Sequence, residues 1–185
     1  MYNIEKLKND LKTTLSEYRY NHCLMVADEA KKLAINYGLD SEKAYVAGLV
    51  HDIAKEYSDE ENLKWIQKYN LPKELLAEHL KPVIHADIGA VVVKELYNFD
   101  DEICNSIKYH SIGNYPMTLF EKIIFVADKI ADNNPTDESL IELQKLAYID
   151  LDATLLKCIE YTKEYLEQRG ATLEPITQKL LDSLK

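Results

Sequence analysis

Four histidines and two aspartates of this chain stand in segments that are otherwise apolar. Burying one such polar group without a partner costs several kcal/mol, so a chain that buries a whole set of them has to bring them partners. Imidazole nitrogens and carboxylate oxygens are both ligands of divalent metal ions. We therefore expect these side chains to meet around a cation. The candidate ligands are His22, His51, Asp52, His85, His110 and Asp128.

Helical spacing places three of the histidines on apolar faces. His22 lies one turn before Val26, and His110 lies one turn after Ile107. His85 begins a run in which isoleucine, glycine and valine recur at the same intervals. Side chains three and four residues apart share one face of a helix, so all three imidazoles are predicted to point inward.

The two aspartates are harder to explain by packing alone. Asp128 ends the apolar run 123–127, and the pair His51-Asp52 follows the apolar run 44–50. Neighbouring side chains on a helix diverge by about 100°. His51 and Asp52 could therefore reach one site only from a distorted helix end, or through a carboxylate with one oxygen on each of two metals.

The combination of ligands favours a metal centre over separate core residues. A lone inward histidine is more often a hydrogen-bonded core residue than a ligand. Here, however, the polar residues follow one another in the order H…HD…H…H…D, which is that of a known metal-binding signature. The fifth histidine, His79, has polar neighbours and is expected at the surface.

The elements that must position these residues are predicted to be helices. The apolar residues recur at helical intervals, and only five glycines and five prolines punctuate the chain. Ser58–Glu61 and Thr118–Glu121 match the capping box that begins many helices. Counting such signals gives an all-α protein of roughly nine to eleven helices.

The length of 185 residues, with 46% hydrophobic residues, suits one well-filled core. We expect a single helical domain over residues 1–185. Its metal-site core would span about residues 19–131, with C-terminal helices at 138–185 packing on it.

Charge and composition exclude several classes of partner. A formal net charge of -10 repels phosphate backbones, so nucleic acid is not an expected partner. No apolar run approaches the ~20 residues of a membrane span, and the first residues mix charges where a signal peptide would be apolar. Three scattered cysteines favour a reducing compartment. We therefore expect a cytoplasmic enzyme without a membrane partner.

The order of the ligands resembles that of the HD-domain metal-dependent phosphohydrolases, a helical family with an H…HD…D core signature. The two additional histidines look like those of its dinuclear members. The resemblance is closest to the YqeK type, bacterial HD-domain hydrolases that split diadenosine tetraphosphate symmetrically into two ADP. It covers nearly the whole chain and is carried by four segments: His51–Lys55, Ile84–Ala90, Tyr109–Gly113 and Glu121–Ile130.

This resemblance implies two divalent ions with the catalytic Asp52 between them. Such a pair would lower the pKa of a shared water and hold a phosphoryl oxygen, which suits hydrolysis of a pyrophosphate link. Iron is the first choice from the resemblance, and manganese, cobalt or nickel also suit an imidazole-rich set better than magnesium does. A homodimer is a further expectation of the family. The expected ligands are His22, His51 and Asp128 for one metal, and His85 and His110 for the other.

A dinucleoside polyphosphate would also need cations from the protein. The candidates for substrate binding are Arg19, Lys55, Lys81 and Lys129. Lys55 lies within one turn of Asp52 and is expected to act on phosphate during catalysis. Arg19 precedes His22 by three residues and shares its face, where a structural salt bridge is an equally good interpretation.

Two segments depart from the family pattern. An arginine often follows the His-x-x-Gly turn, where this chain has Asn114, and a Glu-Pro-Asn-Arg word often follows the last aspartate, where it has residues 131–134, Ala-Asp-Asn-Asn. The alternatives are therefore another HD-domain phosphohydrolase, acting on nucleotides, an alarmone or a cyclic dinucleotide, and a nucleotide-binding regulator without turnover.

Overall fold

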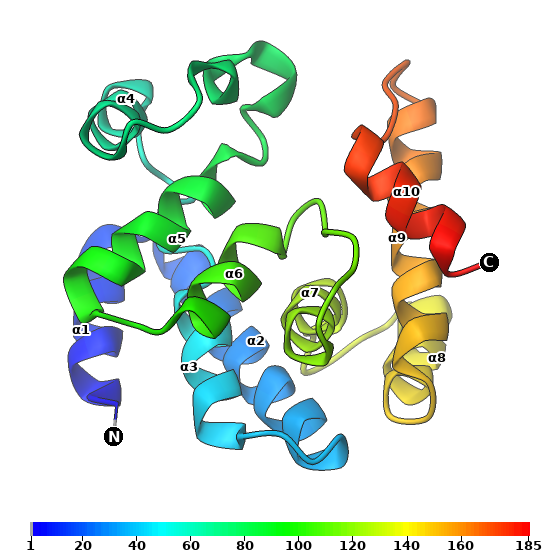
Figure 1. The fold of residues 1–185 in the computed structure, drawn as a ribbon. Helices are drawn as coiled ribbons and strands as arrows, with labels where there is room; N and C mark the ends of the chain where they lie inside the picture. The colour runs from blue at the N-terminus through cyan, green and yellow to red at the C-terminus, as the bar shows by residue number, and fades with distance from the viewer. Residues whose placement is uncertain (1) are drawn as a thin grey trace.

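The computed structural model describes residues 2–185, and within them the chain forms ten α-helices, two short 3-10 helices and no strand (Figure 1). The all-α fold expected from the sequence is confirmed. The helices are α1 (Ile4–Thr14), α2 (Glu17–Asn36), α3 (Ser41–Val50), α4 (Asp59–Tyr69), η1 (Lys73–Leu76), η2 (Glu78–Leu80), α5 (Ile84–Tyr97), α6 (Asp101–Tyr109), α7 (Leu119–Ile130), α8 (Glu138–Ala147), α9 (Leu151–Glu167) and α10 (Pro175–Ser183).

Local sequence signals explain where several helices begin. Both expected capping boxes are formed, at Ser58 before α4 and at Thr118 before α7. In each, the hydroxyl accepts from the backbone amide three residues on, and the glutamate there accepts from the amide of the capping residue. Pro175 opens α10, where its missing N–H costs nothing.

Helix α7 lies at the centre of the molecule and packs against α2, α3 and α6 on one side and against α8 and α9 on the other (Figure 1). Helices α2 and α3 pack closely, because Gly48 has no side chain at their contact. A Cβ at this position would lie 2.9 Å from Ala27 Cα. This close approach brings the residues at the end of α3 next to α2.

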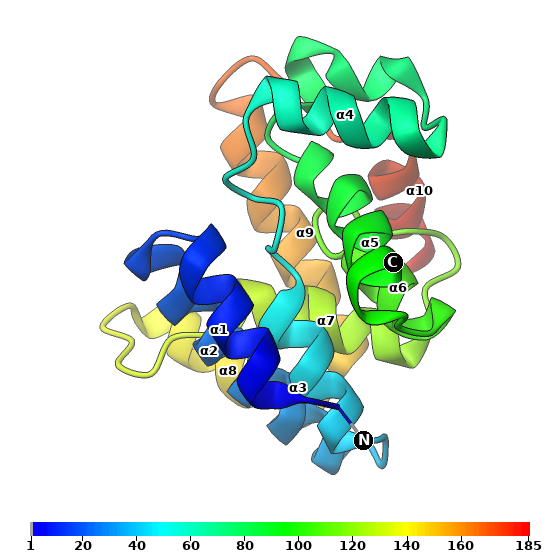
Figure 2. The same ribbon diagram turned by 90° about the vertical axis from the view of Figure 1, so that its left-hand side faces the viewer.

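The core is apolar and continuous, and Leu33, Leu49, Ile88 and Phe125 are among its fully buried side chains. Helix α4 and the two 3-10 helices stand beyond α5 at one end of the molecule, as both views show (Figures 1 and 2). None of the helices within residues 2–185 combines the length and apolarity that crossing a bilayer requires.

Candidate metal centre

Five helices meet at the six residues that were expected to bind metal. His22 comes from α2, His85 from the first turn of α5 and Asp128 from α7. The others lie at helix ends: His110 directly follows α6, and His51 and Asp52 directly follow α3. Four of the six are almost completely buried: His51, Asp52, His85 and His110.

The end of α3 is distorted, which is one of the two arrangements that the sequence left open. Regular helix stops at Val50, and the next residues form tight turns in which the Ile53 amide donates to Val50 O and the Lys55 amide donates to Asp52 O. Because of these turns, the side chains of His51 and Asp52 point toward the same centre. His51 Nε2 lies 3.5 Å from Asp52 Oδ2.

The Asp52 carboxylate lies between two groups of side chains. Its Oδ2 faces His51 Nε2 at 3.5 Å and His22 Nε2 at 4.0 Å, and Asp128 Oδ1 completes that group at 3.0 Å from His22 Nε2 and 3.3 Å from His51 Nε2. Its Oδ1 faces the second group, at 3.1 Å from His85 Nε2 and 3.6 Å from His110 Nε2.

Two histidines point their Nε2 atoms into this centre and their Nδ1 atoms at backbone carbonyls. His51 Nδ1 donates to Gly48 O at 2.7 Å, and His110 Nδ1 donates to Ile107 O at 2.6 Å. Because a carbonyl can only accept, each neutral ring carries its proton on Nδ1 and leaves Nε2 with a lone pair. Such a backbone bond is the usual way to fix a metal-binding histidine.

These lone pairs face other acceptors. His51 Nε2 and Asp52 Oδ1 are buried without a hydrogen-bond partner in residues 2–185, although carboxylate or imidazole atoms lie close to both. Facing acceptors without protons between them are costly in a buried site and are satisfied by a cation. Nitrogen and oxygen donors in this ratio suit a transition metal better than magnesium. The residues present therefore fit divalent metal.

The electrostatics of the site agree with this chemistry. Burial lowers the pKa of His85 to about 4 and also lowers the pKa of His110, which keeps both imidazoles in the neutral, ligating form. Burial also acts to lower the pKa of His51, but the neighbouring carboxylates of Asp52 and Asp128 outweigh it and raise that pKa well above its usual value. The two carboxylates thus favour a positive charge at His51 Nε2, and a bound metal ion would supply that charge in place of the proton.

Of the four cationic residues expected to bind substrate, three lie at the centre and one does not. Arg19 Nη1 donates to Asp52 Oδ2 at 2.8 Å, and Lys129 Nζ donates to Asp128 Oδ2 at 2.8 Å. Both cations are thus held by candidate ligands. Lys81 lies outside the cluster, where its Nζ is 3.0 Å from a Glu78 oxygen.

Of these four cations, Lys55 is the one that no carboxylate of the described residues holds. Its Nζ donates to Pro82 O at 3.2 Å and lies 3.3 Å from His85 Nδ1. Burial lowers the pKa of this amine, the expected effect of a partly desolvated ammonium. Since a carbonyl and an imidazole face its Nζ, Lys55 can donate to an anion that enters beside His85, and such an anion would favour the charged form of the amine.

The sequence interpretation missed one polar group at the centre. Ser111 Oγ lies 3.2 Å from His85 Nε2 and 3.1 Å from His110 Nε2. Its only sequence signal is its position directly after His110. His79, by contrast, is exposed, as expected.

Comparison with known proteins decides the family. A family model described as "HD domain" matches residues 19–133, which include all six candidate ligands. The chain belongs to the HD-domain family. With its His/Asp cluster, this membership identifies a site for divalent metal.

Relatives of this HD-domain protein match it over nearly its whole length. A Bacillus subtilis protein named "Bis(5'-nucleosyl)-tetraphosphatase, symmetrical" is 37% identical over 90% of this chain and 89% of its own. A Staphylococcus aureus protein of the same name is 34% identical, and the match covers 98% of this chain and 93% of the S. aureus protein. The expected resemblance to the YqeK type is therefore confirmed.

A solved structure gives the same result for the fold. The chain superposes with a TM-score of 0.90 on a Clostridium acetobutylicum protein described as a predicted HD superfamily hydrolase involved in NAD metabolism. The two are 32% identical, and the match covers 100% of this chain and 97% of the other.

Proposed function

We propose that this protein hydrolyses diadenosine tetraphosphate symmetrically to two ADP. The observation that carries the proposal is the position of Asp52, whose two oxygens face two separate groups of imidazoles. The names of the relatives from B. subtilis and S. aureus support the substrate.

The proposed centre holds two divalent ions, with iron as the first choice. His22, His51 and Asp128 would hold one, His85 and His110 would hold the other, and Asp52 would offer one oxygen to each. Bound there, divalent metal supplies Lewis acidity toward a phosphoryl oxygen and lowers the pKa of a water at neutral pH.

The protein's own cations would orient the polyphosphate and balance its charge. Lys55 would donate to a phosphate oxygen beside His85, where no carboxylate of residues 2–185 pairs with its ammonium. Arg19 and Lys129 would act mainly on the ligands, because each donates to one of the two aspartates and holds its orientation. Lys81 would reach only a part of the substrate outside the centre.

The reaction balances with water as the only co-substrate. Water attacks one of the two central phosphorus atoms, and the central P–O–P link breaks. The water oxygen stays on one ADP, and the former bridging oxygen leaves with the other.

Metal analysis of the purified protein and chromatography of its reaction products test this function together. We expect bound transition metal, and ADP as the sole nucleotide product from diadenosine tetraphosphate. Production of ATP and AMP would exclude the symmetrical cut. Faster turnover of mononucleotides, alarmones or cyclic dinucleotides would assign the centre to a different HD-domain phosphohydrolase, and binding without turnover would indicate a regulator.

A further inference from the structure

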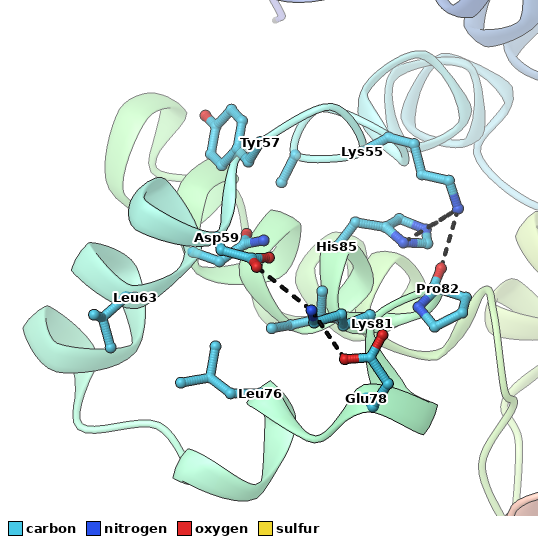
Figure 3. Close-up of a pocket in the computed structure, with 12 residues that line it drawn as sticks. Lys55, Tyr57, Asp59, Leu63, Leu76, Glu78, Lys81, Pro82 and His85 are labelled. Atoms are coloured by element: carbon cyan, nitrogen blue, oxygen red, sulfur yellow. Dashed lines mark hydrogen bonds and ion pairs between the residues drawn. The ribbon is translucent and has the colours of Figure 1, made fainter.

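Beside the proposed metal centre lies a recess of about 600 Å³, a volume within the usual ~300–1,000 Å³ range of small-molecule sites. It lies between the turns after α3, helix α4 and the η1–η2 segment (Figure 3). His85 and Lys55 stand at one end of it, and Leu63 and Leu76 stand at the other. The recess thus runs from the metal centre to an apolar wall.

The charged residues that line the recess indicate which part of a nucleotide would lie at each end. Lys55, at the end next to the centre, has no carboxylate partner among the described residues. Lys81, which also lines the recess, lies 3.0 Å from Glu78 and 3.5 Å from Asp59. Dashed lines in Figure 3 mark both ion pairs. The charge of Lys81 is therefore matched by two carboxylates that repel phosphate. An entering nucleotide would place its phosphates at Lys55 and its uncharged part at the far end.

The wall of the recess contains a polar group that no other described residue hydrogen-bonds. Asn62 lines the recess from α4 and is only 6% exposed, and its Oδ1 has no hydrogen-bond partner in residues 2–185. Buried side-chain oxygens are nearly always hydrogen-bonded, so one left without a partner in the wall of a recess indicates a ligand. Tyr57, Leu63 and Leu76 provide apolar surface for the faces of a flat ring.

We propose that this recess binds the adenine and ribose of one half of the substrate, with Asn62 hydrogen-bonding the edge of the base. An asparagine amide offers a donor and an acceptor side by side, which matches the paired amino group and ring nitrogen of adenine. Asn62 is then a base-binding residue, and Lys55 binds the phosphate nearest the metal centre on the same half. This inference rests on the proposed function.

Calorimetric binding of ADP and of inorganic pyrophosphate to the metal-loaded protein tests the assignment without requiring turnover. Asn62→Leu keeps the size of the side chain and removes its amide. We expect this variant to bind ADP at least ~10-fold more weakly, the scale of losing a two-point amide–base contact, and to bind pyrophosphate as the parent does. Asn36→Leu, a matched change at a residue that does not line the recess, should leave both affinities unchanged.

Leu63→Trp provides a second variant, because its larger ring would fill the apolar end while leaving every candidate ligand in place. We expect it to weaken ADP binding and not pyrophosphate binding. ADP affinity that is unchanged in both variants would overturn the assignment, and so would equal losses for ADP and pyrophosphate. Products other than ADP from diadenosine tetraphosphate would instead refute the proposed function, even where Asn62→Leu still weakened ADP binding.

Discussion

Asp52 is the residue on which both histidine groups depend, because its two oxygens face one group each. We expect Asp52→Ala to lose bound metal and hydrolysis together. The apolar core does not include this side chain, and a water-filled site can replace it, so helical content should be kept. Metal analysis, product chromatography and far-ultraviolet circular dichroism would measure the three properties.

Asp132→Ala is the control for this prediction, because Asp132 is an exposed carboxylate in the loop that follows α7 and lies outside the cluster. It should retain metal and turnover. Unchanged turnover in Asp52→Ala would remove the proposed role of that carboxylate.

Lys55 is the residue expected to contribute most to phosphate recognition, because Arg19 and Lys129 already donate to aspartates. We predict that Lys55→Ala lowers kcat/KM for diadenosine tetraphosphate by at least ~100-fold, the scale of losing a charge contact in the transition state. Its metal content should stay near that of the parent. Steady-state kinetics with metal analysis would check both.

The matched control is Lys122→Ala. Lys122 lies on another part of α7 and pairs with Asp152 of α9. Its effect on kcat/KM should be small. If Arg19→Ala or Lys129→Ala lowered the rate and the metal content together, these two cations would act through the ligands. A parent-like rate in Lys55→Ala would place phosphate recognition elsewhere.

At the scale of elements, the contact between α2 and α3 positions His51 relative to His22. Gly48→Ala would gain up to about 1 kcal/mol in helix propensity, but its Cβ would meet the backbone of α2 at 2.9 to 3.1 Å. Backbone cannot move aside as a side chain can, so the overpacking penalty of about 1–3 kcal/mol should exceed the gain in helix propensity. We expect a lower free energy of unfolding and weaker metal retention, measured by urea unfolding and metal analysis.

Gly89→Ala in α5 is the comparison for this change. The nearest atom to its Cβ would be the side-chain methyl Ile107 Cγ2 at 3.3 Å, which can shift by the small amount required. The gain in helix propensity should then at least offset the cost of this contact, so its free energy of unfolding should be no lower than that of the parent. A Gly48→Ala variant as stable as Gly89→Ala would show that the α2–α3 contact tolerates a wider spacing.

At the scale of the whole molecule, metal at the centre should stabilise the fold, because its candidate ligands come from five helices. A ligand that binds only the folded state at 100 times its Kd adds about 2.7 kcal/mol. For a chain of this length, that corresponds to a change in Tm of roughly 5–10 °C. We expect a strong chelator to lower Tm by this amount, as followed by calorimetry.

Adding manganese or iron back should restore the Tm of the chelated protein. The Tm of Asp52→Ala should respond much less to chelator or metal, which separates binding at the centre from effects on the rest of the surface. A parent Tm that did not respond to chelation would contradict a metal site that joins these helices.

Much of the fold was predictable because it depends on neighbours in the chain. The capping boxes at Ser58 and Thr118 involve residues three apart, and the helical faces involve residues three or four apart. The candidate ligands were also visible, since a polar residue such as Asp128 in an apolar run stands out without any structure. The organisation of residues 1–185 as one domain stays a prediction.

The sequence by itself therefore determined the all-α class, the family and the six candidate ligands. The tertiary structure alone decided that the oxygens of Asp52 face opposite groups, that Arg19 and Lys129 are held by aspartates, and that Asn62 lines a recess. Each of these depends on distances between segments far apart in the chain; His22 and Asp128 meet across 106 residues. Periodicity and caps say which side of a helix faces inward, whereas the packing of whole helices sets which inward side chains meet.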